Sequence, residues 1–137
     1  MFSQATIYSS YSIDDAEKAR DFYGNTLGLN VSLIPGMEDS GMFDLNLAGG
    51  SRVLLYQRPS HEPAAYTVLN VVVSNIDTAI DDLVSKGVQI LRYEGFNQDD
   101  KGVMRGLSVN QGPDIAWFTD PAGNIISVQQ ETASPVH

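Results

Sequence analysis

The side chains that most often carry out chemistry in proteins are few in this chain and widely spaced. It contains no cysteine, which excludes disulfides, thiolate nucleophiles and cysteine-based zinc sites. Its two histidines are His61, in a proline-rich stretch, and His137, the last residue, and we expect both in solvent. Asp44 lies in a predicted strand, and one carboxylate does not hold a divalent ion against water. With no nucleophilic triad, phosphate loop or nucleotide-binding glycine motif, the residues indicate neither a metal centre nor a nucleophilic enzyme.

The charge balance limits the partners of the chain. Its 137 residues include 17 acidic and 8 basic side chains, a formal charge of −9. This balance argues against nucleic acid, because neutralising phosphates needs a basic face, and it permits a cationic ligand. No apolar run approaches the ~20 residues of a membrane span, and the start, MFSQATIYSS, is unlike a signal peptide. We therefore expect a cytoplasmic protein without nucleic-acid or membrane partners.

A strand, a helix and three further strands are predicted in the first half. Asp14 and Asp15 are suitable N-caps for an amphipathic helix, and Gly28 is a suitable residue after its end. Residues 5–13 favour a strand that places Tyr8 and Ser10 on one face. The later strands are predicted at 29–34, 42–47 and 52–57, with a hairpin connection at 48–51.

The second half repeats this order. A strand is predicted at 66–73, followed by a helix that is capped by Asn75 and ends at Gly87. The remaining strands are predicted at 88–93, 115–119 and 125–129, the last two forming a hairpin around Asp120-Pro121-Ala122-Gly123-Asn124. Residues 94–113 form a long connection rich in Gly, Asn, Asp and Gln, in which 107–109 could add a short β segment. Connections of this length usually mark a functional loop.

The repeat predicts an α+β fold made of two βαβββ modules. We expect a single domain over 1–137, with module 1 at 5–57, a linker at 58–65, module 2 at 66–131 and a flexible tail at 132–137. Each module has one sheet face covered by its helix, so the other face needs a partner or a ligand. Two modules side by side predict an eight-stranded curved mixed sheet with helices outside and a concave cup as the default binding site.

Two motifs together give the chain a family resemblance. They are Phe22-Tyr23…Leu27-Gly28-Leu29 near the start and Phe118…Asp120-Pro121…Gly123-Asn124 near the end. With the repeat, they make about residues 5–131 resemble the vicinal oxygen chelate superfamily, which includes glyoxalase I, the extradiol dioxygenases, and the fosfomycin and bleomycin resistance proteins. The resemblance implies the fold more strongly than the function, because this fold carries many chemistries.

The resemblance also implies a metal site that this chain lacks the side chains to form. Family members hold a divalent ion with His, Gln or Glu from the first, fourth, fifth and eighth strands, leaving room for substrate oxygens. The corresponding positions here are Tyr8, Leu54, Val68 and Ser127. None of these is a usual metal ligand. We therefore predict a member that uses neither a metal nor another cofactor.

With the facing that the resemblance implies, aromatic and neutral polar side chains line the cup. The predicted ligand-binding residues are Tyr8, Ser10, Asp44, Tyr56, Asn70, Trp117, Ser127 and Gln129. The aromatic rings suit stacking on a planar or cationic ligand, with Asp44 supplying charge. The alternative is that these rings simply fill the cup as a second core.

Three functions remain open. The first is a binding protein of the bleomycin-resistance kind that sequesters a small cationic or aromatic molecule without metal. The second is a metal-independent lyase or isomerase with Tyr8 or Asp44 as acid or base. In that case Arg52 or Arg105 could anchor an anionic substrate, although Arg52 is expected to point to solvent. The third is a structural or regulatory dimer module with a filled cup. The resemblance implies a homodimer for all three.

Overall fold

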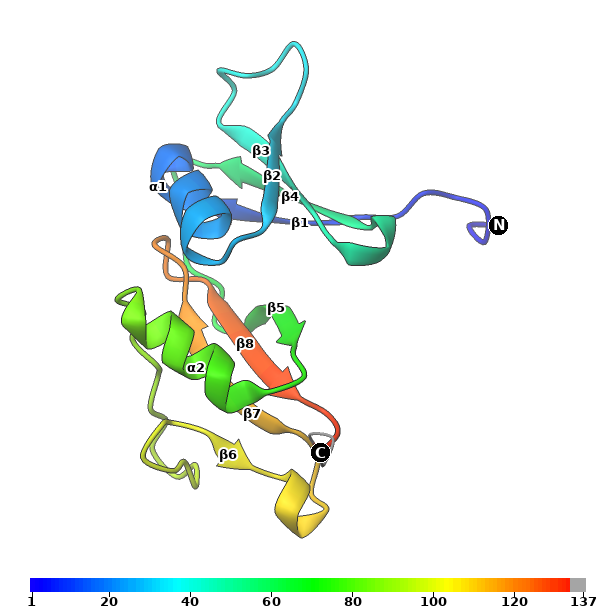
Figure 1. Cartoon of the computed structure of the whole chain (residues 1–137). Helices are drawn as coiled ribbons and strands as arrows, with labels where there is room; N and C mark the ends of the chain where they lie inside the picture. The colour runs from blue at the N-terminus through cyan, green and yellow to red at the C-terminus, as the bar shows by residue number, and fades with distance from the viewer. Residues whose placement is uncertain (134–137) are drawn as a thin grey trace. The chain divides into compact units, whose positions relative to one another are not determined.

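The computed structural model describes residues 1–133, and the chain divides into two compact units, residues 1–63 and the residues from Ala64 onward (Figure 1). The boundary falls within the predicted linker. His137 and most of the predicted tail lie outside the described residues. The fold is α+β, as predicted.

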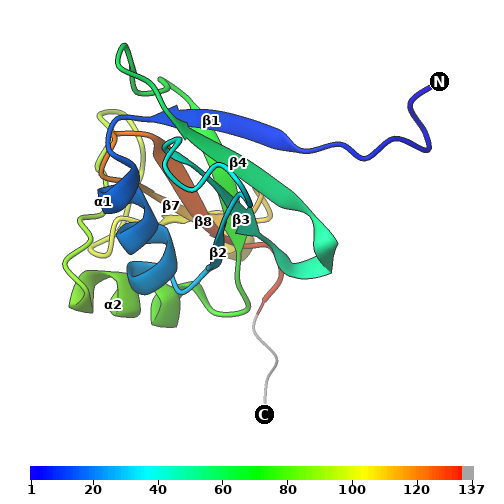
Figure 2. The same cartoon turned by 90° about the horizontal axis from the view of Figure 1, so that it is seen from above.

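The first unit is a four-stranded mixed sheet with the helical segment of residues 16–26 on one face. The order of its elements along the chain is β1 (Ser9–Ile13), α1 (Ala16–Asp21), η1 (Phe22–Thr26), β2 (Asn30–Leu33), β3 (Met42–Asn46), η2 (Ala48–Gly50) and β4 (Arg52–Gln57). The strand order in the sheet is β1-β4-β3-β2, with β1 parallel to β4 and the other neighbours antiparallel. Figure 2 shows β1 and β4 side by side.

Local signals explain the helix of this unit. The Asp15 side chain accepts a hydrogen bond from the Lys18 backbone N–H at 3.2 Å, which satisfies one of the free donors at the start of α1. The helix continues as the π-helical turn η1, and Gly28 then takes a φ of 71° that favours glycine. Alternation along the strands puts buried Phe43 and Leu55 on the helix-covered face. The opposite face therefore carries the polar side chains.

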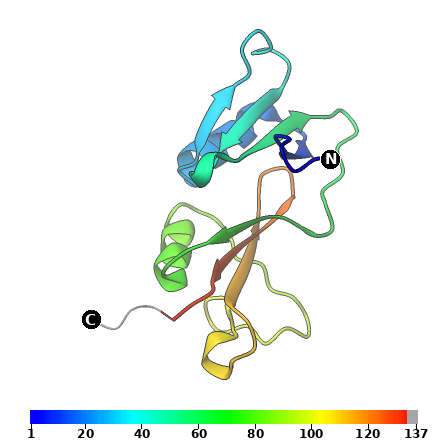
Figure 3. The ribbon, with the colours of Figure 1, turned by 90° about the vertical axis from the view of Figure 1, so that its right-hand side faces the viewer.

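The second unit repeats this plan (Figure 3). Its elements are β5 (Thr67–Val72), α2 (Ile76–Ser85), β6 (Met104–Arg105), η3 (Leu107–Val109), β7 (Asp114–Thr119) and β8 (Ile125–Gln130). The strand order is β5-β8-β7-β6, with β5 parallel to β8. Asn75 caps α2 by accepting from the Thr78 N–H at 3.1 Å, and the apolar stripe of the helix, Ile76, Ile80 and Leu83, is buried. No helix in residues 1–133 is long and apolar enough to cross a membrane.

The predicted β7–β8 hairpin is held by a buried carboxylate. Asp120 is 3% exposed, and its Oδ1 accepts hydrogen bonds from the backbone N–H groups of Ala122 and Asn124, each at 2.9 Å. Its Oδ2 accepts from the Asn124 side chain at 3.1 Å. Gly123 takes a φ of 85°, the positive value that the turn was predicted to need. The turn therefore forms through the residues that predicted it.

Four sequence predictions about strands were wrong in detail. The eight strands form two hydrogen-bonded sheets of four rather than one sheet of eight. The first strand begins at Ser9 rather than at residue 5, and 107–109 form the 3-10 turn η3 rather than a β segment. Residues 88–93 form no strand, and β6 takes the place beside β7.

The Gln98 side chain explains the missing strand. Leu91 does donate its N–H to the Trp117 carbonyl of β7 at 2.8 Å. However, Gln98 accepts the N–H of Tyr93 through Oε1 at 2.8 Å and donates to the Leu91 carbonyl through Nε2 at 2.9 Å. A side chain thus occupies the backbone groups that a continuous ladder would use.

Candidate ligand-binding site

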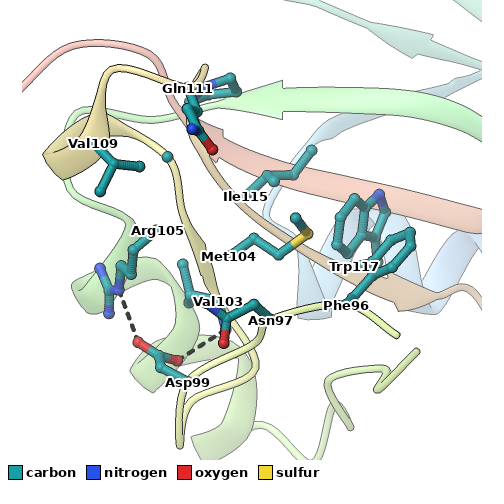
Figure 4. Close-up of a pocket in the computed structure, with 12 residues that line it drawn as sticks. Phe96, Asn97, Asp99, Val103, Met104, Arg105, Val109, Gln111, Ile115 and Trp117 are labelled. Carbon is teal, nitrogen blue, oxygen red and sulfur yellow. Dashed lines mark hydrogen bonds and ion pairs between the residues drawn. The ribbon is translucent and has the colours of Figure 1, made fainter. Parts of the chain in front are cut away.

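A pocket of about 580 Å³ lies within the second unit, where the long connection between α2 and β7 folds over strands β6 and β7 (Figure 4). Its lining residues are Phe96, Asn97, Asp99, Val103, Met104, Arg105, Gly106, Val109, Gln111, Pro113, Ile115 and Trp117. The volume is in the range of small-molecule sites, and the lining is mainly apolar with a few amide and charged groups. The connection predicted to be functional therefore builds a pocket.

An aromatic cluster, Tyr93, Phe96 and Trp117, borders this pocket. The ring centroids of Trp117 lie 5.5 Å from Tyr93 and 5.6 Å from Phe96, and those of Tyr93 and Phe96 are 5.3 Å apart. The Tyr93 and Trp117 planes meet at 84°, an edge-to-face contact. Phe96 is 49% exposed, so part of this apolar surface remains accessible to a ligand.

Arg105 fastens the pocket wall to the rest of the unit. Its guanidinium donates to both carboxylate oxygens of Asp77 on α2 at 2.8 and 3.1 Å, and its Nε donates to Asp99 at 2.8 Å. It also lies 3.5 Å from the carboxylate of Asp114 on β7. Figure 4 shows the Asp99–Arg105 contact at the edge of the pocket. One cation thus joins the helix, the loop and the strand.

These ion pairs shift the pKa values of the groups that form them. Hydrogen bonds from Arg105 lower the pKa of Asp77 to about 2. Asp77 in turn raises the pKa of Arg105 above its ordinary value. For Asp99, partial burial raises the pKa, but hydrogen bonds from the Val103 N–H and from Arg105 outweigh it and leave the pKa lowered. All three groups are therefore charged at neutral pH, and Arg105 is satisfied internally rather than available as the anion anchor considered from sequence.

Asp99 also shapes the loop around itself. Its Oδ1 accepts the backbone N–H groups of Lys101 and Val103, each at 2.9 Å, while Gly102 takes a φ of 86°. This turn places the Val103 side chain, which is fully buried, in the pocket wall. Asp99 and Gly102, whose residue types favour turns, therefore hold this part of the loop.

Polar side chains adjoin the pocket on the same face of the second sheet. This amide cluster consists of Asn70 on β5 with Ser127 and Gln129 on β8. Asn70 Oδ1 accepts from Ser127 Oγ at 2.6 Å and from Gln129 Nε2 at 3.1 Å, and Gln129 Nε2 also contacts Ser127 Oγ at 3.1 Å. In register, Trp117 pairs with Ser127 and Ile115 pairs with Gln129. Paired residues share a face, so the amide cluster lies beside the pocket lining.

The other predicted ligand-binding residues, Tyr8, Ser10, Asp44 and Tyr56, belong to the first unit. The Asp44 carboxylate accepts from Arg52 at 3.2 Å, and the Arg52 guanidinium lies 3.6 Å from the centre of the Tyr8 ring. Ser10 and Asp44 are each paired with Leu54, and Tyr56 lies two residues along, so these side chains share the face away from α1. Each unit thus carries part of the predicted set.

Two expectations about exposed side chains were wrong. Arg52 does not simply point to solvent, because it pairs with Asp44 and covers Tyr8. His61 is half-buried, and its Nδ1 lies 2.7 Å from the hydroxyl of Ser12. Its position in a proline-rich stretch gave no sign of this contact, since Ser12 lies 49 residues earlier.

The residues at the implied metal positions do not fit a divalent ion. Leu54 and Val68 have no donor atom, and the Ser127 hydroxyl is already engaged with Asn70 at 2.6 Å. Within residues 1–133, no three His, Cys, Asp or Glu side chains come together as a metal-binding group. All four implied metal positions, Tyr8, Leu54, Val68 and Ser127, thus carry neutral side chains.

Comparison with known proteins gives the same fold. A family model described as "Glyoxalase/Bleomycin resistance protein/Dioxygenase superfamily" matches residues 8–128. The solved structure of a glyoxalase family protein from Bacillus anthracis is 18% identical, covers 96% of this chain and 98% of its own, and has a TM-score of 0.70. TnmS3, an antibiotic binding protein from Streptomyces sp. CB03234, is 22% identical over 94% and 98%, with a TM-score of 0.64. A superfamily member from Sphaerobacter thermophilus DSM 20745 is 25% identical over 91% and 97%, also with a TM-score of 0.64. No curated protein matches the chain.

Proposed function

We propose that this chain, which belongs to the glyoxalase/bleomycin resistance protein/dioxygenase superfamily, is a binding protein that sequesters a small organic molecule without a metal ion. The observation that carries the proposal is the pocket of about 580 Å³ in the second unit, with the aromatic cluster at its border. Such a combination of concave apolar surface and a few polar groups is typical of ligand sites.

The charges favour an aromatic over a cationic ligand. Asp44 was the carboxylate expected to meet a cation, but its charge is balanced by Arg52 at 3.2 Å. Asp99, which lines the pocket, is likewise paired with Arg105 at 2.8 Å. Aromatic rings, by contrast, are present with accessible surface at Phe96. We therefore propose a ligand with a flat apolar part that lies against Phe96 and Trp117.

Metal-free binding is supported by the donor chemistry of the implied metal positions, where Leu54 and Val68 supply no ligand atoms. The sequestering role is supported by the shared fold of TnmS3, which is an antibiotic binding protein. We do not propose the lyase or isomerase alternative. Arg52 engages Asp44 and Tyr8, the two residues that such an enzyme would use as acid or base. The pocket also disfavours a purely structural module with a filled site.

A thermal-shift screen of chelator-treated protein tests the proposal. Planar aromatic compounds are added to the wild type, and one present at 100 times its Kd adds ~2.7 kcal/mol of stability. Met104→Trp fills the pocket and should abolish the shift, whereas Met37→Trp, on an exposed loop of the first unit, should preserve it. Shifts that need added metal, or that survive Met104→Trp, argue against the proposal.

We also propose a homodimer, which the superfamily resemblance implies, and a cytoplasmic location, which was expected from the sequence. Light scattering during size-exclusion chromatography tests the dimer directly. A mass of twice one chain at micromolar concentration supports it, and the mass of a single chain rejects it.

A further inference from the structure

We propose that the amide cluster of Asn70, Ser127 and Gln129 is a second contact site for the same ligand and selects a neutral group that both accepts and donates a hydrogen bond. A carboxamide or a lactam is such a group. This inference rests on the proposed function, because it assumes that a ligand occupies the adjoining pocket. It adds the chemical class of that ligand: a flat apolar ring system with a neutral amide at its edge.

The internal hydrogen bonds of the cluster leave one donor and one acceptor unused. Asn70 Oδ1 accepts from Ser127 Oγ at 2.6 Å and from Gln129 Nε2 at 3.1 Å. These bonds orient the Asn70 side chain and leave its Nδ2 as a donor and Gln129 Oε1 as an acceptor. If both amides were turned over together, Asn70 would present the acceptor and Gln129 the donor. Either way the cluster offers a matched pair, which is complementary to an amide.

The cluster and the pocket lie on one continuous face. Ser127 pairs with Trp117, and Gln129 pairs with Ile115, while both Trp117 and Ile115 line the pocket. Neighbouring strands lie about 5 Å apart. A ring system resting on Trp117 therefore reaches the cluster with a substituent of ordinary bond length. Asn70, on the next strand, is exposed and open to such a group.

Within residues 1–133, the side chains that the register places next to the cluster on this face are uncharged, which sets its preference for a neutral group. The register places Ile115, Trp117 and Thr119 of β7 beside β8, and Asn70 and Val72 of β5 on its other side, all of them uncharged. The charged groups nearest to this face are already paired: Arg105 of β6 and Asp114 of β7 are register partners on the alternate side of these strands, and Arg105 also pairs with Asp77 of α2 and with Asp99 of the pocket lining. A charged group bound at the cluster would lose water without gaining a partner charge.

The test compares three probes of the same size: a naphthamide, its methyl ketone and its carboxylate, all substituted at the same ring position. Proton–nitrogen correlation spectra report binding separately at the single indole N–H of Trp117 and at the side-chain amides of Asn70 and Gln129. We expect the naphthamide to shift all three signals. Because the ketone lacks the N–H that donates one of the two hydrogen bonds, the naphthamide should bind roughly 2- to 10-fold more tightly than the ketone. The carboxylate should bind more weakly than the ketone.

Two variants assign the preference to the cluster. Asn70→Asp keeps the shape of the side chain and its acceptor but removes its N–H donor. Gln129→Met keeps the length of the side chain but removes both its donor and its acceptor. With Asn70 Nδ2 as the free donor, Gln129→Met removes the acceptor for the probe's N–H and should reduce the preference for naphthamide over ketone to less than about 2-fold while leaving ketone binding in place. Asn70→Asp removes the donor that meets the carbonyl of both probes and should weaken naphthamide and ketone alike. Asn25→Asp adds the same charge on η1 of the first unit and should leave the binding of both probes unchanged.

The outcomes separate the two proposals. A shift at Trp117 without shifts at Asn70 and Gln129, or a naphthamide preference that survives Gln129→Met, overturns this inference and leaves the proposed function intact. If none of the three probes shifts the Trp117 signal, both proposals, the binding function and the amide contact, are overturned for this ligand class.

Discussion

Replacing Arg105 by glutamine tests whether one guanidinium holds the pocket wall in place. Arg105 pairs with Asp77, Asp99 and Asp114, whose side chains are 46%, 35% and 12% exposed. The first two contacts are partly screened by solvent and are worth up to about 1 kcal/mol each. Asp114 is nearly buried, and leaving its charge without a cation costs about a further 1 kcal/mol, since it still accepts the Leu107 N–H at 3.0 Å. The expected loss is therefore about 2–3 kcal/mol.

Denaturant unfolding at neutral pH and fixed ionic strength measures this loss. In a chain of this size, roughly 4 °C of melting temperature is lost per kcal/mol, so the melting temperature should fall by roughly 8–12 °C. Lys86→Gln is the matched control, because it also removes one positive charge and breaks an exposed pair with Asp82, worth about 0.3–0.5 kcal/mol. Hydrogen exchange of residues 96–112 should accelerate in the Arg105 variant alone. A stability within about 0.5 kcal/mol of the Lys86 variant would refute the reasoning.

Other predictions concern the same loop, its helix and the hairpin. The pKa of Asp77 is lowered from 3.8 to about 2 in the folded protein. The contribution of ionised Asp77 to the free energy of unfolding is therefore present above about pH 4 and lost as the pH falls toward 2. Because the Asp77 side chain is half-exposed, Asp77→Asn should reduce the change in unfolding free energy across this pH window by less than about 1 kcal/mol. Gly106→Ala brings a Cβ within 2.5 Å of the Pro113 carbonyl and should cost about 1–3 kcal/mol in denaturant unfolding, whereas Gly24→Ala, whose nearest contact is at 3.6 Å, should be neutral or stabilising. Asp120→Ala removes three accepted hydrogen bonds in a buried turn and should cost about 2–4 kcal/mol, measured in the same way; a loss below about 1 kcal/mol would show that the turn forms without them.

The elements predicted well are those specified by neighbouring residues. Asp15 and Asn75 cap the two helices through side chains that reach only three residues along the chain. The β7–β8 turn likewise depends on Asp120 and Gly123, which are close in sequence. The superfamily motif combines such local features, so the fold could be recognised before any tertiary contact was known.

The pocket could be located only in outline, because its walls depend on contacts distant in sequence. The unusual length of 94–113 pointed to a functional loop, but Arg105 is fixed by Asp77, 28 residues earlier. The segment 88–93 had a good strand pattern, and the Gln98 side chain overrode it by occupying its backbone groups. No periodicity in the sequence signals either contact.

The aromatic residues show the same limit. Trp117 was among the predicted ligand-binding residues because the facing that the resemblance implies places it in the cup. Tyr93 and Phe96 were missed, although they complete the cluster around it. The available signal was Phe96, an aromatic residue within a connection otherwise rich in Gly, Asn and Asp, with Tyr93 just before that connection, since a polar loop has little reason to carry an aromatic side chain unless it packs.

Fluorescence titration of Trp117 is the most direct test of metal-free binding in the second unit. Trp117 is the only tryptophan of the chain and lines the pocket, so its emission reports on this site alone. Chelator-treated protein is titrated with a planar aromatic compound that absorbs outside the tryptophan band, with and without added zinc, nickel or manganese. We predict a saturable change with one molecule bound per chain and the same Kd with or without metal. Binding that appears only after metal is added, or emission that never changes with any compound, would contradict it.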